Sequence, residues 1–127
     1  MHKRKKNNIN EKYDEHIIEA LKKLPKPLKT FDDHNVYFNV DKRKETIFEH
    51  IANKKHHLHE TDISQIPIIL KDIKCLKNDR YGSKFRNYIA KRKKRKEKKK
   101  FLKIVTELKK NNNESITTIC CVKNNKR

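Results

Sequence analysis

Histidine and basic side chains are the groups of this chain that could do chemistry. His50, His56 and His57 stand close together in the sequence, and three later segments are rich in Lys, Arg, Tyr and Thr. Imidazole transfers protons near neutral pH, and fixed cations stabilise the charge that develops on a phosphoryl group. Closely paired carboxylates are not conspicuous. This combination suits the cleavage of a phosphodiester.

A helix predicted from about Lys42 to His57 would align these groups. Arg43, His50 and His57 follow one another at intervals of seven residues, so they share one stripe of the helix, and Lys54 lies beside it. The stripe borders the apolar side of the helix, so we expect His50 to be half-buried. A half-buried histidine beside cations would be neutral near pH 7, as a general base for a ribose 2′-hydroxyl must be. The alternative is that His50 only makes a hydrogen bond at the edge of the core.

Three strand candidates carry the other polar groups: Lys84–Lys91, Phe101–Leu108 and Ser115–Lys123. Alternation places Lys84, Arg86 and Tyr88 on one face of the first. We expect Lys103 and one of Thr117 or Thr118 to join them. Such a face would bind phosphate oxygens and stack a base, although an ordinary solvated sheet face also carries Lys and Thr. The residues expected to contact RNA, including two from a basic loop, are Arg43, Lys54, Lys84, Arg86, Tyr88, Arg92 and Arg95.

A metal site is the competing interpretation of the histidines. His56, His57, His59 and Cys75 include the His-x-His spacing that can bind zinc. Neither a second cysteine pair nor a carboxylate completes the set. Surface histidines at the end of a helix are the simpler interpretation. We therefore expect neither a metal nor another cofactor.

The charge of the chain favours a polyanionic partner. The chain has 35 Lys and Arg residues but only 16 Asp and Glu residues, which gives a net charge of +19. Nucleic acid is the commonest polyanion. The run from Lys91 to Lys100 is predicted to contact an RNA backbone. A nuclear import signal and a solvated loop are the alternatives. Coding bias in an AT-rich genome would also enrich Lys, Asn and Ile.

The cysteines and the N-terminus bear on location. The spacing of Cys75, Cys120 and Cys121 does not suggest a disulfide framework. Reduced thiols are typical of a reducing compartment such as the cytosol. The basic N-terminus is not followed by an apolar stretch, so we do not expect a signal peptide, and no run approaches the length of a membrane span. We expect a cytoplasmic protein without a membrane partner.

The apolar residues recur at helical and strand spacing, and 127 residues suffice for one modest core. Their spacing predicts a helix from Glu11 to Leu24. A later helix would be capped by Asp62, with Pro67 near its first turns, and Asp41 would cap the middle helix. Alternation predicts a strand from Asn35 to Val40.

Helices thus come first and strands last. This order predicts an α+β fold in which N-terminal helices pack on a small antiparallel β-sheet, formed as a meander. Residues 1–30 are expected to form a basic tail and a helix, and residues 31–127 a single α+β domain.

From Val36 to Val122 the order of these features resembles the phage-type barnase–EndoU–colicin–RelE-like nucleases. The second histidine lies one position further along than in that group, which leaves His56 and His57 undecided, and the basic loop before Lys100 is unusually long. The matching features are His50-Ile51, Lys55-His56-His57, Ile66-Pro67-Ile68-Ile69-Leu70, the segment from Tyr81 to Tyr88, Lys103 in Phe101-Leu102-Lys103-Ile104-Val105, and Thr117-Thr118.

The resemblance implies a metal-independent endoribonuclease, acting as a toxin in bacterial or phage conflict or in RNA processing. His50 would be the general base or acid, with His56 or His57 as its counterpart. Attack by the 2′-hydroxyl would leave a 2′,3′-cyclic phosphate. The implied partners are RNA and, besides it, a ribosome or an acidic antitoxin or immunity protein. The further implied roles are stabilisation of the phosphorane by Lys103 and Arg86 and positioning of the phosphate by Thr117 or Thr118.

Two other functions remain open from the sequence. A non-catalytic RNA- or ribosome-binding protein needs only the charge and the basic loop. A catalytically decayed nuclease would also fit. Catalysis requires His50 to lie within about 10 Å of Lys103 and of one of Thr117 or Thr118, because a catalytic cluster surrounds one phosphate.

Overall fold

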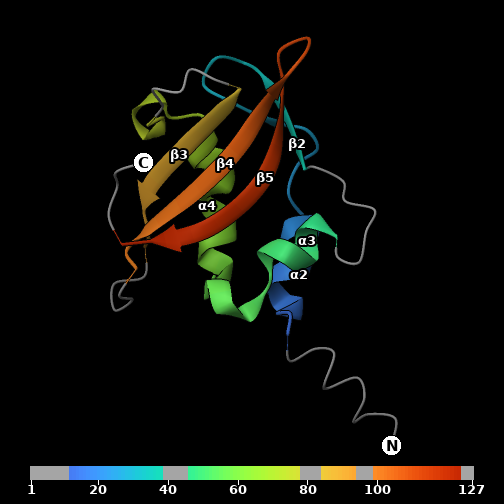
Figure 1. Cartoon of the computed structure of the whole chain (residues 1–127), viewed down its shortest axis with the longest axis vertical. Coiled ribbons are helices and arrows are strands. Elements are labelled where there is room, and N and C mark those ends of the chain that lie inside the picture. Colours follow the sequence, from blue (N-terminus) through green and yellow to red (C-terminus); the bar gives the residue numbers. More distant parts are fainter. Residues whose placement is uncertain (1–11, 39–45, 78–83, 94–98, 124–127) are drawn as a thin grey trace, which may run out of the picture.

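The computed structural model describes residues 12–38, 46–77, 84–93 and 99–123. A five-stranded sheet lies in front of helix α4, and helices α2 and α3 lie beside its lower end (Figure 1). The elements in chain order are α2 (Glu15–Lys22), β1 (Leu28–Lys29), β2 (Asn35–Phe38), α3 (Ile47–Ile51), the 3-10 turn η1 (Lys54–His56), α4 (Glu60–Leu70), the 3-10 turn η2 (Ile73–Cys75), β3 (Phe85–Lys91), β4 (Phe101–Lys109) and β5 (Asn113–Val122).

The fold is α+β, as expected, but the sheet is mixed. Its strand order is β1-β2-β5-β4-β3. β3, β4 and β5 pair antiparallel, whereas β2 runs parallel to β5 and β1 antiparallel to β2. The parallel pair exists because the chain leaves β2, passes through the helices and β3–β4, and returns to lie beside it in the same direction. An antiparallel sheet was therefore too simple an expectation.

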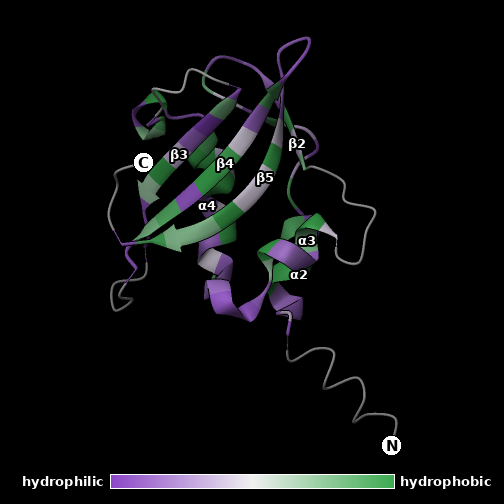
Figure 2. Cartoon of the chain, viewed as in Figure 1, coloured by the Kyte–Doolittle hydropathy of each residue, from purple (hydrophilic) through white to green (hydrophobic). Residues whose placement is uncertain are grey.

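One hydrophobic core joins the helices to one face of the sheet. Along β4 the buried residues Leu102, Ile104 and Thr106 alternate with the more exposed Lys103 and Val105. Hydrophobic and hydrophilic bands accordingly alternate along this strand (Figure 2). The face that carries Lys103 is called the open face below. The core includes Ile17, Ile18 and Leu21 of α2, Ile51 of α3, Ile63, Ile66, Ile69 and Leu70 of α4, and Ile116 and Ile119 of β5.

The middle helix is much shorter than predicted. Thr46 and Glu49 form a capping box, each side chain bonding to the backbone N–H of the other, so α3 begins at Ile47. It ends at Ile51, and His57 adopts a left-handed conformation, with φ of 56°, after η1. The prediction of one helix from Lys42 to His57, with His50 and His57 on the same side of it, is therefore wrong. Asp41, the expected N-cap, lies outside the described residues.

Helix α4 also begins earlier than predicted. It begins at Glu60 after His59, and Asp62 is its third residue, whose carboxylate accepts from the His59 N–H at 2.8 Å. Pro67 lies near the C-terminal end rather than in the first turns. Proline removes one intrahelical hydrogen bond there, and burial of the helix's apolar side offsets this loss. None of the described helices is long and apolar enough to cross a membrane.

The turn between β4 and β5 contains two asparagines with positive φ. Asn111 and Asn112 have φ of 62° and 59°, and asparagine tolerates this left-handed region better than most residues. The hairpin brings Lys109 opposite Asn113 and fixes the register of the two long strands.

Candidate functional site

A bulge in β5 lies beside α3, the helix that carries His50. Within the described residues, β2 pairs with β5 as far as Ile116, and α3 contacts β5 as well (Figure 1). Val105 pairs with Thr118 and Thr106 pairs with Ile116, so Thr117 is an extra residue in β5. Such a bulge re-aims side chains and is frequent beside active sites. The two neighbouring threonines therefore have different surroundings.

His50 and Thr118 meet at this bulge. Nε2 of His50 lies 3.4 Å from Oγ1 of Thr118, and the His56 ring stands edge-on to the His50 ring, with 5.5 Å between the centroids. Nδ1 of His56 lies 3.1 Å from the carbonyl oxygen of Ile51. Because a carbonyl only accepts, Nδ1 of His56 carries a proton, and the neutral ring has its basic lone pair on Nε2. His50 is exposed rather than half-buried, because the short helix α3 presents it toward solvent.

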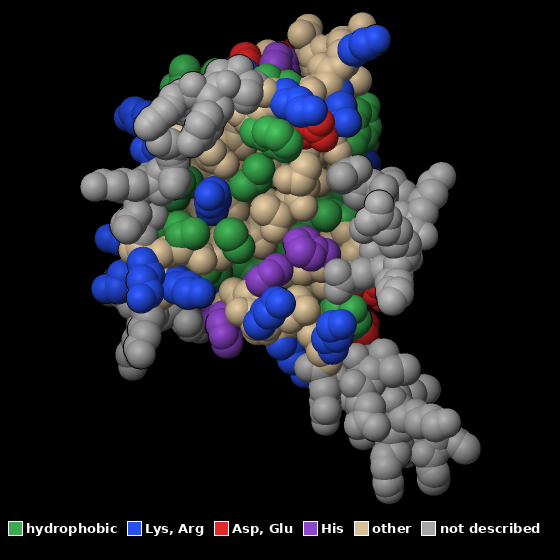
Figure 3. Space-filling model, viewed as in Figure 1, with side chains coloured by type: hydrophobic (Ala, Val, Ile, Leu, Met, Phe, Trp, Pro, Cys, Tyr) green, Lys and Arg blue, Asp and Glu red, His purple; other side chains and the backbone are tan. Residues whose placement is uncertain are grey.

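Lys103 and Thr118 project from the open face. Lys103 pairs with Cys120, two residues beyond Thr118 on β5. Diagonal neighbours on one face of a sheet are roughly 7–8 Å apart. A phosphate bound at Thr118 would therefore lie within reach of the long Lys103 side chain. Histidine side chains gather over the lower part of this face, with lysine and arginine side chains around them (Figure 3).

His57 and Thr117 take other positions. Oγ1 of Thr117 donates to the carbonyl oxygen of Val105 at 3.3 Å. The carbonyl of His57 accepts from Arg92 at 3.2 Å. Of the two adjacent pairs of candidates, His56 and Thr118 are thus the members that the structure brings beside His50.

Of the four other expected RNA contacts, two lie within the described residues. Lys54 is exposed and lines a cavity of about 290 Å³ together with Asp14, His57 and His59; His50 does not line it. Lys84 is exposed immediately before β3, whereas the other two contacts, Arg43 and Arg95, fall outside that part of the chain.

Arg86 and Tyr88 require a correction. Their alternation in β3 is right, but their face turns toward the core, where they pair with Thr106 and Ile104 of β4. Tyr88 is 0% exposed, and its hydroxyl donates to Glu114 at 2.9 Å. Tyr88 is therefore a core residue and does not offer its ring to a base.

Glu114 is the centre of a buried polar cluster that the sequence did not indicate. Arg86 connects it to Asp32, which accepts two hydrogen bonds from the guanidinium at 2.8 and 3.2 Å. These bonds hold the pKa of the Asp32 carboxyl far below its usual value, and burial raises the pKa of the Tyr88 phenol. The fully buried Glu114 carboxylate accepts from His34 (2.7 Å), Arg86 (2.7 Å), Tyr88 (2.9 Å) and Thr106 (2.8 Å).

The position of Glu114 in the sequence is the one signal that could have revealed this cluster. It stands two residues before Ile116, on the inward side of a strand, where a carboxylate needs buried partners. Its partner His34 lies 80 residues away and Arg86 lies 28 residues away, so their identity could not be read from spacing. Arg86 projects from the core-facing side of the sheet and bonds to Glu114 and Asp32. It therefore cannot stabilise a phosphorane on the open face.

The prediction that Arg92 contacts RNA is also wrong. It is 4% exposed rather than available to RNA. Its guanidinium donates to both oxygens of Asp62, at 2.9 and 2.7 Å, and to the carbonyl of Lys99 at 2.8 Å. A buried arginine must be paired in this way. Arg92 thus anchors the base of the basic loop instead of contacting a ligand through it.

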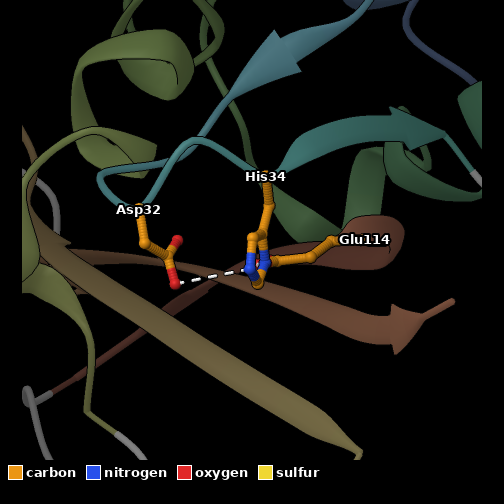
Figure 4. A group of neighbouring side chains, drawn as sticks. All are labelled: Asp32, His34 and Glu114. Atoms are coloured by element: carbon orange, nitrogen blue, oxygen red, sulfur yellow. Dashed lines mark hydrogen bonds and ion pairs between the residues drawn. The ribbon is translucent and has the colours of Figure 1, made fainter. Parts of the chain in front are cut away.

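The histidines do not form a metal site with Cys75. Cys75 lies in η2, beyond the far end of α4 from His59. Within the described residues, the one group with metal-binding spacing is Asp32, His34 and Glu114 (Figure 4). The Arg86 guanidinium already bonds to both carboxylates, and Nε2 of His34 lies 3.5 Å from Asp32. The three side chains therefore fit an ion-pair network with Arg86 better than a cation site.

Comparison with known proteins gives no family model, curated protein or solved structure that matches this chain. The fold and the open face are therefore the basis for inferring a function.

Proposed function

We propose that this protein is a metal-independent endoribonuclease whose active site lies on the open face, around His50, His56, Lys103 and Thr118. One imidazole would take the proton of a ribose 2′-hydroxyl, and the 2′-oxygen would attack the adjacent phosphorus. The bond from phosphorus to the 5′-oxygen would break as the second imidazole protonates that oxygen. The products are a 2′,3′-cyclic phosphate and a 5′-hydroxyl.

The contact between His50 and Thr118 is the observation that carries this proposal. The two residues are 68 positions apart in the sequence, and Nε2 and Oγ1 lie 3.4 Å apart at a β-bulge on an exposed face. A second imidazole, that of His56, stands at 5.5 Å. Two imidazoles beside a hydroxyl and an ammonium provide the base, acid, phosphate-binding and charge-stabilising groups that the reaction requires.

The arrangement supports a separate role for each residue. His56 has Nδ1 held by the Ile51 carbonyl, which leaves Nε2 as its proton-transfer atom. Thr118 would donate a hydrogen bond to a phosphate oxygen, and Lys103 would stabilise the phosphorane. Similarity to the phage-type barnase–EndoU–colicin–RelE-like nucleases, with helices on one side of a largely antiparallel sheet, is part of the same proposal, as are a toxin or RNA-processing role and an acidic inhibitor.

Incubation with a single-stranded RNA in EDTA tests the proposal. We expect fragments that end in a 2′,3′-cyclic phosphate, and we expect no cleavage where a 2′-deoxynucleotide replaces the attacking nucleotide. His50→Ala and His56→Ala should each lower the rate by about 10²–10⁴-fold. RNA affinity should change little, because it depends mainly on the lysines.

His16→Ala is the matched control for the histidine variants. His16 lies on α2 with its side chain 84% exposed and pairs with Glu60, so this variant should cleave like the wild type. Cleavage retained in folded His50→Ala would reject the assigned site. Cleavage that requires a divalent ion would reject the metal-independent mechanism.

A non-catalytic RNA-binding protein is the second candidate. The observation that favours it is the net charge of +19 together with exposed lysines around the open face, for which the histidines are not needed. Tight RNA binding by the wild type without any cleavage product would select this function. The exposed lysines of the described residues on η1 and near the basic loop are Lys54, Lys55, Lys91, Lys93, Lys99 and Lys100.

A further inference from the structure

A single register row crosses four strands of the sheet with an aromatic residue at each end. Phe85 of β3 pairs with Glu107 of β4, Glu107 pairs with Ser115 of β5, and Ser115 pairs with Tyr37 of β2. Residues that pair directly across strands project from the same face. The neighbouring Val36 is in the core, so this row projects from the open face.

Both aromatic rings are exposed to solvent. Tyr37 is 47% exposed and Phe85 43%. Among the described residues, the other large apolar side chains with high exposure are Ile68 and Ile73, in the helical part of the chain. The two exposed aromatics therefore stand out as a pair on the same face as His50 and Thr118.

The spacing of the two rings suits splayed bases rather than a continuous stack. Three strand intervals of about 4.8 Å separate Phe85 from Tyr37 by about 14 Å. Bases stacked in a helix are only about 3.4 Å apart. Bases held on both rings would have to be unstacked from each other, as in single-stranded RNA bound to aromatic platforms.

The charges on this face indicate how a bound RNA strand would lie. Glu107, in the middle of the aromatic row, pairs with Lys84 at 3.4 Å and Lys109 at 3.3 Å. These two lysines neutralise the Glu107 carboxylate, which can also accept from the amino groups of bases. The neighbouring rows contain Thr118, opposite Val105, and Lys103, opposite Cys120. Phosphates would favour these rows, and bases the row of Phe85 and Tyr37.

We propose that the open face binds single-stranded RNA across the strands, with one base stacked on Phe85, another on Tyr37, and the connecting phosphates over Thr118 and Lys103. This inference rests on the proposed function, since it takes RNA as the ligand and places the scissile phosphate between the two platforms. Duplex RNA is excluded as the preferred ligand because its bases cannot separate onto the two rings.

Single tryptophans provide a direct test, because the chain contains no tryptophan. Phe85→Trp and Tyr37→Trp would each introduce one, and Ile68→Trp would place one in α4 as a control. The probe is an eight-nucleotide 2′-O-methyl RNA, which lacks the attacking hydroxyl. We expect it to quench the fluorescence of the first two variants and to leave that of the control unchanged. Absence of quenching in both sheet variants would overturn the proposal.

Alanine variants measure the contribution of each ring. Base–aromatic stacking contributes about 1–3 kcal/mol per base, so Phe85→Ala and Tyr37→Ala should each weaken binding of the single-stranded probe by about 5- to 150-fold. Ile68→Ala should not. Annealing the probe to its complement should weaken its binding to the wild type and largely remove the difference between the variants. Equal losses of affinity for single strand and duplex would contradict stacking.

The binding assay separates this inference from the proposed reaction. Quenching and aromatic-dependent affinity in a protein that does not cleave RNA would support the platforms and reject the nuclease. Cleavage that requires His50, in variants whose affinity does not depend on Phe85 or Tyr37, would support the nuclease and reject the platforms.

Discussion

Arg92 and Asp62 form an ion pair in which neither side chain is exposed, with Nη2 of the arginine 2.7 Å from Oδ2 of the aspartate. The same guanidinium donates to the carbonyls of His57 and Lys99. It therefore connects the base of the basic loop to the turn after η1 and the start of α4, which lie 30 to 35 residues earlier in the sequence. The position of the histidine turn relative to the sheet depends on this pair.

Removal of one partner should destabilise the protein strongly. Arg92→Met leaves a buried carboxylate without its cation, which costs about 3–5 kcal/mol of unfolding free energy. The double variant Arg92→Met/Asp62→Leu should recover most of this stability, since it leaves no buried charge. Lys93→Met, next in the chain and exposed, should change stability by less than about 0.5 kcal/mol. Urea titration measures all three, and a decrease below about 1 kcal/mol in Arg92→Met would contradict the structure.

Tyr88→Phe should separate a structural role from an RNA-binding one. The change removes a hydroxyl that donates to Glu114 and should lower the unfolding free energy by about 1–2 kcal/mol. RNA affinity should stay at the wild-type value, because the ring lies in the core. A large decrease of affinity in a folded variant would instead favour Tyr88 as a base-stacking residue.

Stability should fall in acid through Asp32. Its hydrogen bonds from Arg86 lower its pKa in the folded state below the ordinary value of 3.8. As the pH falls below about 4, the unfolded carboxyl takes up a proton before the folded one does, so the stabilisation present at higher pH progressively disappears. Asp32→Asn should lower stability at neutral pH and flatten this acid dependence.

Asp33→Asn is the control for that measurement. Asp33 is 86% exposed on its side chain and pairs with Lys29 instead. Denaturant titrations from about pH 2.5 to about pH 6 should show wild-type acid dependence in this variant. An equally steep dependence in Asp32→Asn would mean that other carboxyls account for it.

Secondary structure was predictable where one periodicity is repeated. β3 and β4 begin and end within one residue of the predicted strands. The helix around His50 was predicted with the wrong length. Its length depends on the Thr46–Glu49 capping box and on packing against β5, and neither follows from the spacing of His50 and His57.

The candidate site was predictable in part for a similar physical reason. Side chains on one strand were assigned correctly to alternate faces, but the choice of inward face was wrong for Arg86 and Tyr88. Apolar Phe85 and Ile89 suggested that their own side of β3 faces the core. The side of Arg86 and Tyr88 faces it instead, because the buried carboxylate of the distant Glu114 bonds to both of them. His50 and Thr118 could be proposed as neighbours because the resemblance supplied their order; the bulge that distinguishes Thr118 from Thr117 could not.

RNA affinity should depend steeply on salt through the lysines at the base of the basic loop. Lys91, Lys93, Lys99 and Lys100 are exposed at the ends of β3 and β4, where Arg92 fixes the backbone. Each cation that neutralises a phosphate of a single strand contributes about 0.7 to the slope of log affinity against log salt. Replacing all four by Gln should therefore lower the slope by up to about 2.8.

A charge-matched variant shows whether this effect belongs to the surface or to net charge. Gln at Lys22, Lys23, Lys71 and Lys74, which are exposed on the helical side of the chain, removes the same number of charges. This control should keep nearly the wild-type slope, because these four cations do not touch the bound strand. Anisotropy titrations of the 2′-O-methyl probe from about 50 to about 400 mM KCl compare the two variants. Equal slopes in both would show that the basic loop makes no direct phosphate contacts, and that only the overall field of the protein attracts RNA.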